Sequence, residues 1–81
     1  MLPQSRESRH RFKGRLEGAG KEATCDGWCT EVSFSDGKTV FQDYQLWEES
    51  VTPRLPDGAY ELSVHGNRRP ATRLNGRWLV S

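Results

Sequence analysis

Four basic side chains recur at every second position near the start of the chain: Arg9, Arg11, Lys13 and Arg15. Alternate residues of a β-strand lie about 6.6–6.8 Å apart on one face, so this spacing predicts a single basic strand face. Such a row can neutralise the phosphates of a nucleic-acid strand. The plainer interpretation is that these side chains only solvate an exposed face of a sheet. Four more arginines would extend the row if the last hairpin lies beside the first strand: Arg68, Arg69, Arg73 and Arg77.

Aromatic side chains beside such a row could stack on nucleic-acid bases. Tyr44 and Trp47 are the candidates, because they lie outside the clearest alternating segments. Trp28 is predicted to belong to the core, because it continues an even-numbered apolar series. Trp78 is predicted to face Arg73 across the Asn75-Gly76 turn, where an arginine–indole stack would be structural or functional. The sequence therefore predicts a nucleic-acid-binding face built from arginine and one of two aromatic residues.

The charge distribution supports a second hypothesis from a different class of function. The net charge is only +1, but residues 1–24 carry +3, residues 25–50 carry −5 and residues 51–81 carry +3. An adaptor or inhibitor could use the acidic middle segment to bind a basic surface on a partner protein. Its contact residues would be Asp26, Glu31, Asp36, Asp43, Glu48 and Glu49.

Catalysis and metal binding have weak support in this sequence. Cys25 and Cys29 have a spacing that zinc sites use, but no second pair of ligands follows, and His10 and His65 lie far apart. No serine or cysteine has a neighbouring base, and no glycine-rich phosphate loop follows a predicted strand. We therefore expect a non-enzymatic protein with no cofactor and no metal, whose two cysteines remain reduced in the cytoplasm.

Short alternating segments separated by glycine-containing turns predict an all-β fold. The first strand is expected over residues 9–17, with His10, Phe12, Gly14 and Leu16 facing inward. Residues 21–25 are expected to form a short strand that ends at an Asp26-Gly27 turn. A hairpin is expected over residues 31–42, with a two-residue Asp36-Gly37 loop that pairs Val32 with Phe41. A strand over residues 59–65 and a hairpin around Asn75-Gly76 complete the pattern.

The 81 residues predict one small domain, mainly β, with five to seven short strands. Residues 1–8 are expected to be a flexible tail, residues 9–81 the domain, and residues 43–51 at most one short helix. The predicted order of elements is compatible with a small antiparallel barrel or coiled sheet of the OB type, and an SH3-like barrel fits nearly as well. No apolar run is long enough to cross a membrane, so cytoplasmic residence is expected. The partner is expected to be DNA or RNA, or alternatively another protein.

Overall fold

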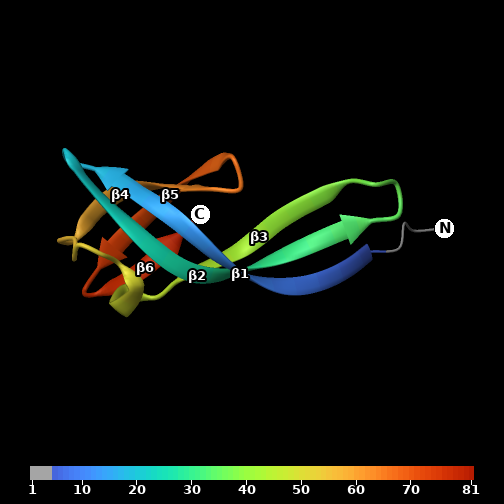
Figure 1. Ribbon diagram of the computed structural model, residues 1–81, viewed down its shortest axis with the longest axis horizontal. Helices are drawn as coiled ribbons and strands as arrows, with labels where there is room; N and C mark the ends of the chain where they lie inside the picture. The colour runs from blue at the N-terminus through green and yellow to red at the C-terminus, as the bar shows by residue number, and fades with distance from the viewer. Residues whose placement is uncertain (1–4) are drawn as a thin grey trace.

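The computed structural model describes residues 5–81, which form six antiparallel strands and one short 3-10 turn (Figure 1). In chain order the elements are β1 (Ser5–Gly18), β2 (Lys21–Phe34), β3 (Thr39–Leu46), η1 (Glu48–Ser50), β4 (Gly58–Val64), β5 (Asn67–Leu74) and β6 (Arg77–Val80). The strands make one sheet in the order β3-β2-β1-β4-β5-β6, and its two outer strands β3 and β6 pack against each other. The sheet is therefore a nearly closed barrel, and the predicted fold class is confirmed.

Part of the sheet extends beyond the barrel as an arm. β1 and β2 pair over all 14 residues of each strand, whereas β4 pairs with β1 only from Arg15 to Glu17. The first half of β1, the second half of β2 and the start of β3 therefore project as a three-stranded ribbon, on the right of Figure 1. We call residues 5–11, 28–34 and 39–42 the arm. It makes the molecule 47 Å long but only 19 Å and 18 Å across.

The barrel core combines bulky side chains from β1 and β4 with small ones from β2. Phe12 and Leu16 of β1 face inward, as predicted, and so does Leu62 of β4. The inward-facing residues of β2 are all small: Ala23, Cys25, Gly27 and Cys29. Small residues on β2 leave room for the bulky side chains, because interiors are packed at crystal-like density.

β2 continues without interruption through Asp26 and Gly27, so the predicted turn at this dipeptide is wrong. A Cβ atom on Gly27 would collide with the backbone carbonyl of Gln45 and would lie 2.8 Å from the Phe12 ring. Glycine is therefore needed here for the close approach of β3 and not for a turn. Because Gly27 faces the core, its neighbour Trp28 projects from the outer face, and the predicted core position of Trp28 is also wrong.

The hairpin between β2 and β3 forms, but its register differs by one residue from the prediction. The Phe34 N–H donates to the Lys38 carbonyl at 2.8 Å, and the Gly37 N–H donates to the Phe34 carbonyl at 3.0 Å. The loop therefore has three residues and ends at Gly37, whose φ is +89°. A shift of one residue exchanges the two faces of a strand, so Phe41 pairs with Glu31 and stacks on His65.

The helix expected over residues 43–51 is reduced to the three-residue turn η1. Residues 43–46 belong to β3, where Asp43 has φ +55° instead of capping a helix. The register between β2 and β3 shifts between Trp28 and Thr30, which marks a β-bulge beside Asp43. Such a bulge bends the strand and increases its twist. It redirects the end of β3 toward η1.

The first strand is longer than predicted. β1 begins at Ser5, and Ser5–Ser8 pair with residues 31–34 of β2 instead of forming a tail. The rest of the expected tail, residues 1–4, lies outside the described residues. His10 does not face the core: it is exposed on the arm, where its Nε2 contacts the Glu31 carboxylate.

Candidate nucleic-acid interface

The four basic residues of β1 share the outer face of the sheet, as their spacing predicts. Arg9, Arg11, Lys13 and Arg15 are all exposed. Their partners on β2 are, in the same order, Thr30, Trp28, Asp26 and Thr24. Directly paired residues of adjacent strands share a face, so an indole lies in the middle of the basic row.

Two indoles and two guanidinium groups form a contiguous cluster on this face. The Trp28 and Trp47 rings meet edge to face, with centroids 6.1 Å apart and planes at 68°. Arg9 Cζ lies 5.7 Å from the centroid of the Trp28 ring, and Arg11 Cζ lies 5.2 Å from that of Trp47. Both distances are in the range in which a cation is attracted to the negative face of an aromatic ring. We call these four residues the guanidinium–indole cluster.

Hydrogen bonds between η1 and β2 hold Trp47 beside Trp28. The Trp47 N–H donates to the Asp26 carbonyl at 3.3 Å. The Ser50 hydroxyl accepts the Asp26 N–H at 2.9 Å and lies 2.7 Å from the Trp47 carbonyl, to which it can donate. Both indoles are half-buried, so the backbone fixes them while part of each ring remains accessible.

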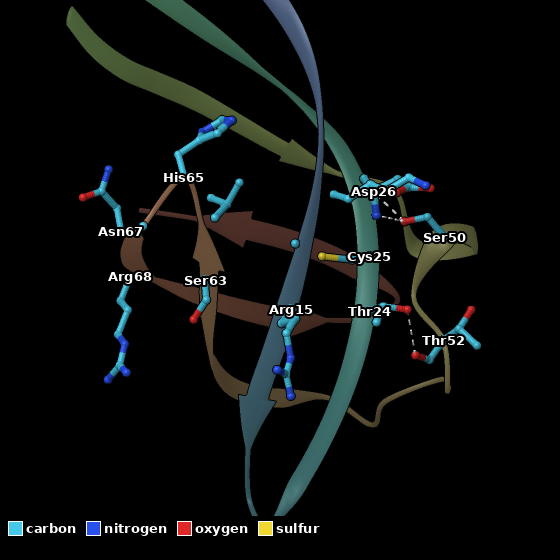
Figure 2. A pocket seen from close by; sticks show the side chains of 14 residues that line it. Arg15, Thr24, Cys25, Asp26, Ser50, Thr52, Ser63, His65, Asn67 and Arg68 are labelled. Atoms are coloured by element: carbon cyan, nitrogen blue, oxygen red, sulfur yellow. Dashed lines mark hydrogen bonds between the residues drawn. The ribbon is translucent and has the colours of Figure 1, made fainter.

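The basic row continues into a groove where β1 and β4 diverge (Figure 2). Arg15, Ser63 and Arg68 are consecutive partners across β1, β4 and β5, and Figure 2 shows both arginines extending on either side of Ser63. Lys13 and His65 also line this groove. The groove is rich in hydroxyl and basic groups, so polar or anionic ligands fit it better than apolar ones.

The two arginines of the groove already form ion pairs with carboxylates of this chain. Arg15 Nη2 lies 2.7 Å from Glu22 Oε1 and 3.9 Å from Glu17, while Arg68 lies 3.6 Å from Glu61. Within residues 5–81, no carboxylate oxygen lies within 4.0 Å of the charged groups of Arg9, Arg11 or Lys13. These three cations are therefore the part of the predicted row that is free for a ligand. We call them the free basic row.

Of the four C-terminal arginines predicted to extend the row, Arg68 lies beside Arg15 in the groove, but Arg69, Arg73 and Arg77 do not join it. Arg73 is buried, with 8% of its surface exposed, and its Nε lies 2.7 Å from Glu48 Oε2 while Nη1 contacts Asp57. Arg69 donates to the Phe41 carbonyl at 2.9 Å. Arg77 is exposed at the start of β6, and in the sheet β4 and β5 lie between this strand and β1. Arg73 is held by Glu48 and Asp57, and Arg69 by the Phe41 carbonyl, so both arginines are engaged within the barrel.

Tyr44 is not available for base stacking, although the sequence made it a candidate. Its ring is buried against Phe12, with centroids 5.6 Å apart, and Arg69 lies 4.7 Å from its centroid. Burial raises the pKa of its hydroxyl.

The residue that the sequence interpretation missed is Trp28. The run of small residues at alternate positions of β2 was the available signal, because it marks the inward face and places Trp28 on the other one.

The six acidic residues of the alternative hypothesis do not share one free surface. Glu48 binds Arg73 and also accepts the Trp78 indole N–H at 3.2 Å, and Glu31 contacts His10. The predicted pairing of Trp78 with Arg73 is confirmed, but Glu48 links the two side chains. Asp26 lies on β2, Asp36 in the arm hairpin, Asp43 at the bulge and Glu49 in η1.

Neither cysteine is paired with another residue. Cys25 and Cys29 are both free and buried. Burial raises the pKa of the Cys25 thiol to about 11 and also raises that of Cys29. Among residues 5–81, no three His, Cys, Asp or Glu side chains lie close enough together to hold a metal ion.

The described residues include no helix of the length and apolarity needed to cross a membrane. No protein-family model, no curated protein and no solved structure matches this chain. The barrel, the free basic row and the guanidinium–indole cluster are therefore the basis for assigning a function.

Proposed function

We propose that this protein is a small non-enzymatic module that binds single-stranded DNA or RNA on the outer face of β1 and β2. The observation that supports this most strongly is the guanidinium–indole cluster, which lies on the same face as Lys13. Single-strand-binding surfaces combine cations that follow the phosphates with aromatic rings on which bases stack. This face has both components, and within residues 5–81 none of its three cations lies within 4.0 Å of a carboxylate oxygen.

The geometry favours a single strand over a duplex. Bases reach an indole or a guanidinium plane only when they are splayed out of a helix. From Arg9 to Lys13 the strand rises about 13 Å, which suits a contact with a few nucleotides. Stacking contributes roughly 1–3 kcal/mol per base, so one or two stacked bases and three phosphate contacts give a modest and salt-sensitive affinity.

Fluorescence anisotropy with a labelled 12-nucleotide strand at low salt tests this proposal. We expect wild-type protein to bind, the Arg9→Glu/Arg11→Glu double variant to lose binding, and Trp47→Ala to weaken it. Arg54→Glu is the matched control, because Arg54 is exposed, forms no ion pair within residues 5–81 and lies in the β3–β4 connection. Equal binding by the double variant would assign the ligand to another surface, and no binding at all would refute the proposed function.

We also propose that the protein acts in the cytoplasm. Two buried and unpaired thiols fit a reducing compartment, where small domains seldom carry disulfides. The alternative, an adaptor or inhibitor whose acidic middle segment binds a basic partner, gains no support from the structure, because Glu31 and Glu48 already contact His10 and Arg73.

A further inference from the structure

The arm leaves one long strand edge open. β1 pairs with β2 on one side, and β4 reaches only Arg15–Glu17 on the other side. Among the described residues, no strand pairs with residues 5–11 on that second side. Figure 1 shows this part of β1 as an outer strand of the arm, away from the barrel. Its outward N–H and C=O groups can therefore pair with another extended chain.

The charges of this edge determine which chain can pair with it. Residues 5–11 contain Arg6, Arg9 and Arg11 but one carboxylate, Glu7. A second copy would bring two such strands together, and like charges on directly paired residues are destabilising. A segment with carboxylates at alternate positions would instead place them opposite arginines.

We propose that the open edge of β1, residues 5–11, binds an extended acidic peptide segment, which adds to the sheet as a seventh strand. The backbone of the segment would pair with β1 in the manner of β-strand addition. Alternate carboxylates would lie beside Arg9 and Arg11, which share the outer face, and Arg6 projects from the other face. Seven residues of such a segment would span about 23 Å. The segment would share Arg9 and Arg11 with the proposed nucleic-acid site, but this proposal does not depend on that function, because the added strand pairs with backbone groups of the edge.

The test uses a nine-residue peptide of alternating threonine and aspartate, titrated into the full chain and followed by amide NMR shifts and hydrogen exchange. We expect shifts and slowed exchange in the arm part of β1, and roughly tenfold weaker binding to the Arg9→Glu/Arg11→Glu variant, with Arg54→Glu unchanged. Two further peptides carry N-methyl groups on one or the other set of alternate amides. Only one set of amides of an added strand faces β1, so methylation of one set must abolish binding while methylation of the other preserves it.

Three outcomes would overturn the proposal. Equal binding by both methylated peptides would show simple charge attraction without strand pairing. Concentration-dependent protection of residues 5–11 without peptide would show that a second copy is the occupant. Absence of binding by the unmodified peptide would show that the edge does not accept this segment. Oligonucleotide binding by the same samples would separate each of these results from failure of the proposed nucleic-acid function.

Discussion

Substitution of Gly27 by alanine should strongly destabilise the barrel. The added methyl group would collide with the Gln45 carbonyl of β3 and approach the Phe12 ring at 2.8 Å. Overpacking of this kind costs about 1–3 kcal/mol, and the upper end applies because a paired backbone cannot move away. The lower entropy of the unfolded chain with alanine offsets about 0.4–1 kcal/mol. We therefore expect a net loss of about 2 kcal/mol.

Gly14 provides a graded comparison for the same measurement. Its added methyl group would meet the tip of the Leu62 side chain at 2.9 Å and the Ser63 carbonyl at 3.2 Å. A side-chain tip can move more easily than a backbone, so Gly14→Ala should cost about 1 kcal/mol.

Thermal unfolding followed by circular dichroism measures both effects. For a domain of this size, 1 kcal/mol corresponds to about 4–8 °C, so Gly27→Ala should lower Tm by roughly 8–16 °C. The same variant should change the tryptophan fluorescence, because displacement of β3 moves Trp47 away from Trp28. If Gly27→Ala melts at the wild-type temperature, β3 does not approach β2 at Gly27 as described.

Two further predictions concern the exposed Asp57 carboxylate and the two buried thiols. The Asn75 N–H, with smaller contributions from Gly76 and Arg73, holds the pKa of Asp57 below its ordinary value. The stability that this carboxylate contributes is complete above its unfolded pKa and is lost as the pH falls through the lower folded value. Urea unfolding between about pH 5 and pH 2 should therefore show a smaller acid loss for Asp57→Asn than for wild type, and equal losses would contradict this assignment. A thiol reagent at neutral pH should label neither Cys25 nor Cys29 in the folded chain and both in denaturant, whereas rapid labelling of folded protein would show that the core opens there.

Alternation and turn residues were sufficient to predict the fold class. The predicted inward positions of Phe12 and Leu16 are confirmed, and the turn at Asn75-Gly76 connects β5 and β6 as expected. These features depend on neighbours in the sequence, because a period of two residues and the φ values of short turns are local properties.

Features that depend on contact between distant strands were not predictable in this way. Asp26-Gly27 has the composition of a turn, but this dipeptide lies inside β2. Glycine is needed there because the Gln45 carbonyl of β3 approaches too closely for a side chain. The one-residue error in the β2–β3 hairpin arose because the loop has three residues, the last of them Gly37 at positive φ, and not two. Local propensity is a weak guide where tertiary packing opposes it.

The candidate site was predictable only where it depends on neighbours in the sequence and not on contacts between distant strands. Alternation alone identified Arg9, Arg11 and Lys13, because exposed residues of one strand need no tertiary information. The role of Arg73 on β5 depends on Glu48 in η1, which lies 25 residues earlier in the chain, before β4. A contact over this distance in sequence cannot be inferred from local patterns. Trp28 was assigned to the wrong face because the interruption of β2 was placed at Gly27.

The salt dependence of oligonucleotide binding tests the central claim most directly. Three free cations should give a slope of about −2 for log K against log salt concentration on a single strand, so affinity should fall roughly 20-fold between 50 and 200 mM salt. The Arg9→Glu/Arg11→Glu variant should lose this dependence together with its binding. A wild-type affinity that does not change with salt, or a double variant with the wild-type slope, would contradict the assignment of the outer face of β1 and β2 as the nucleic-acid-binding surface.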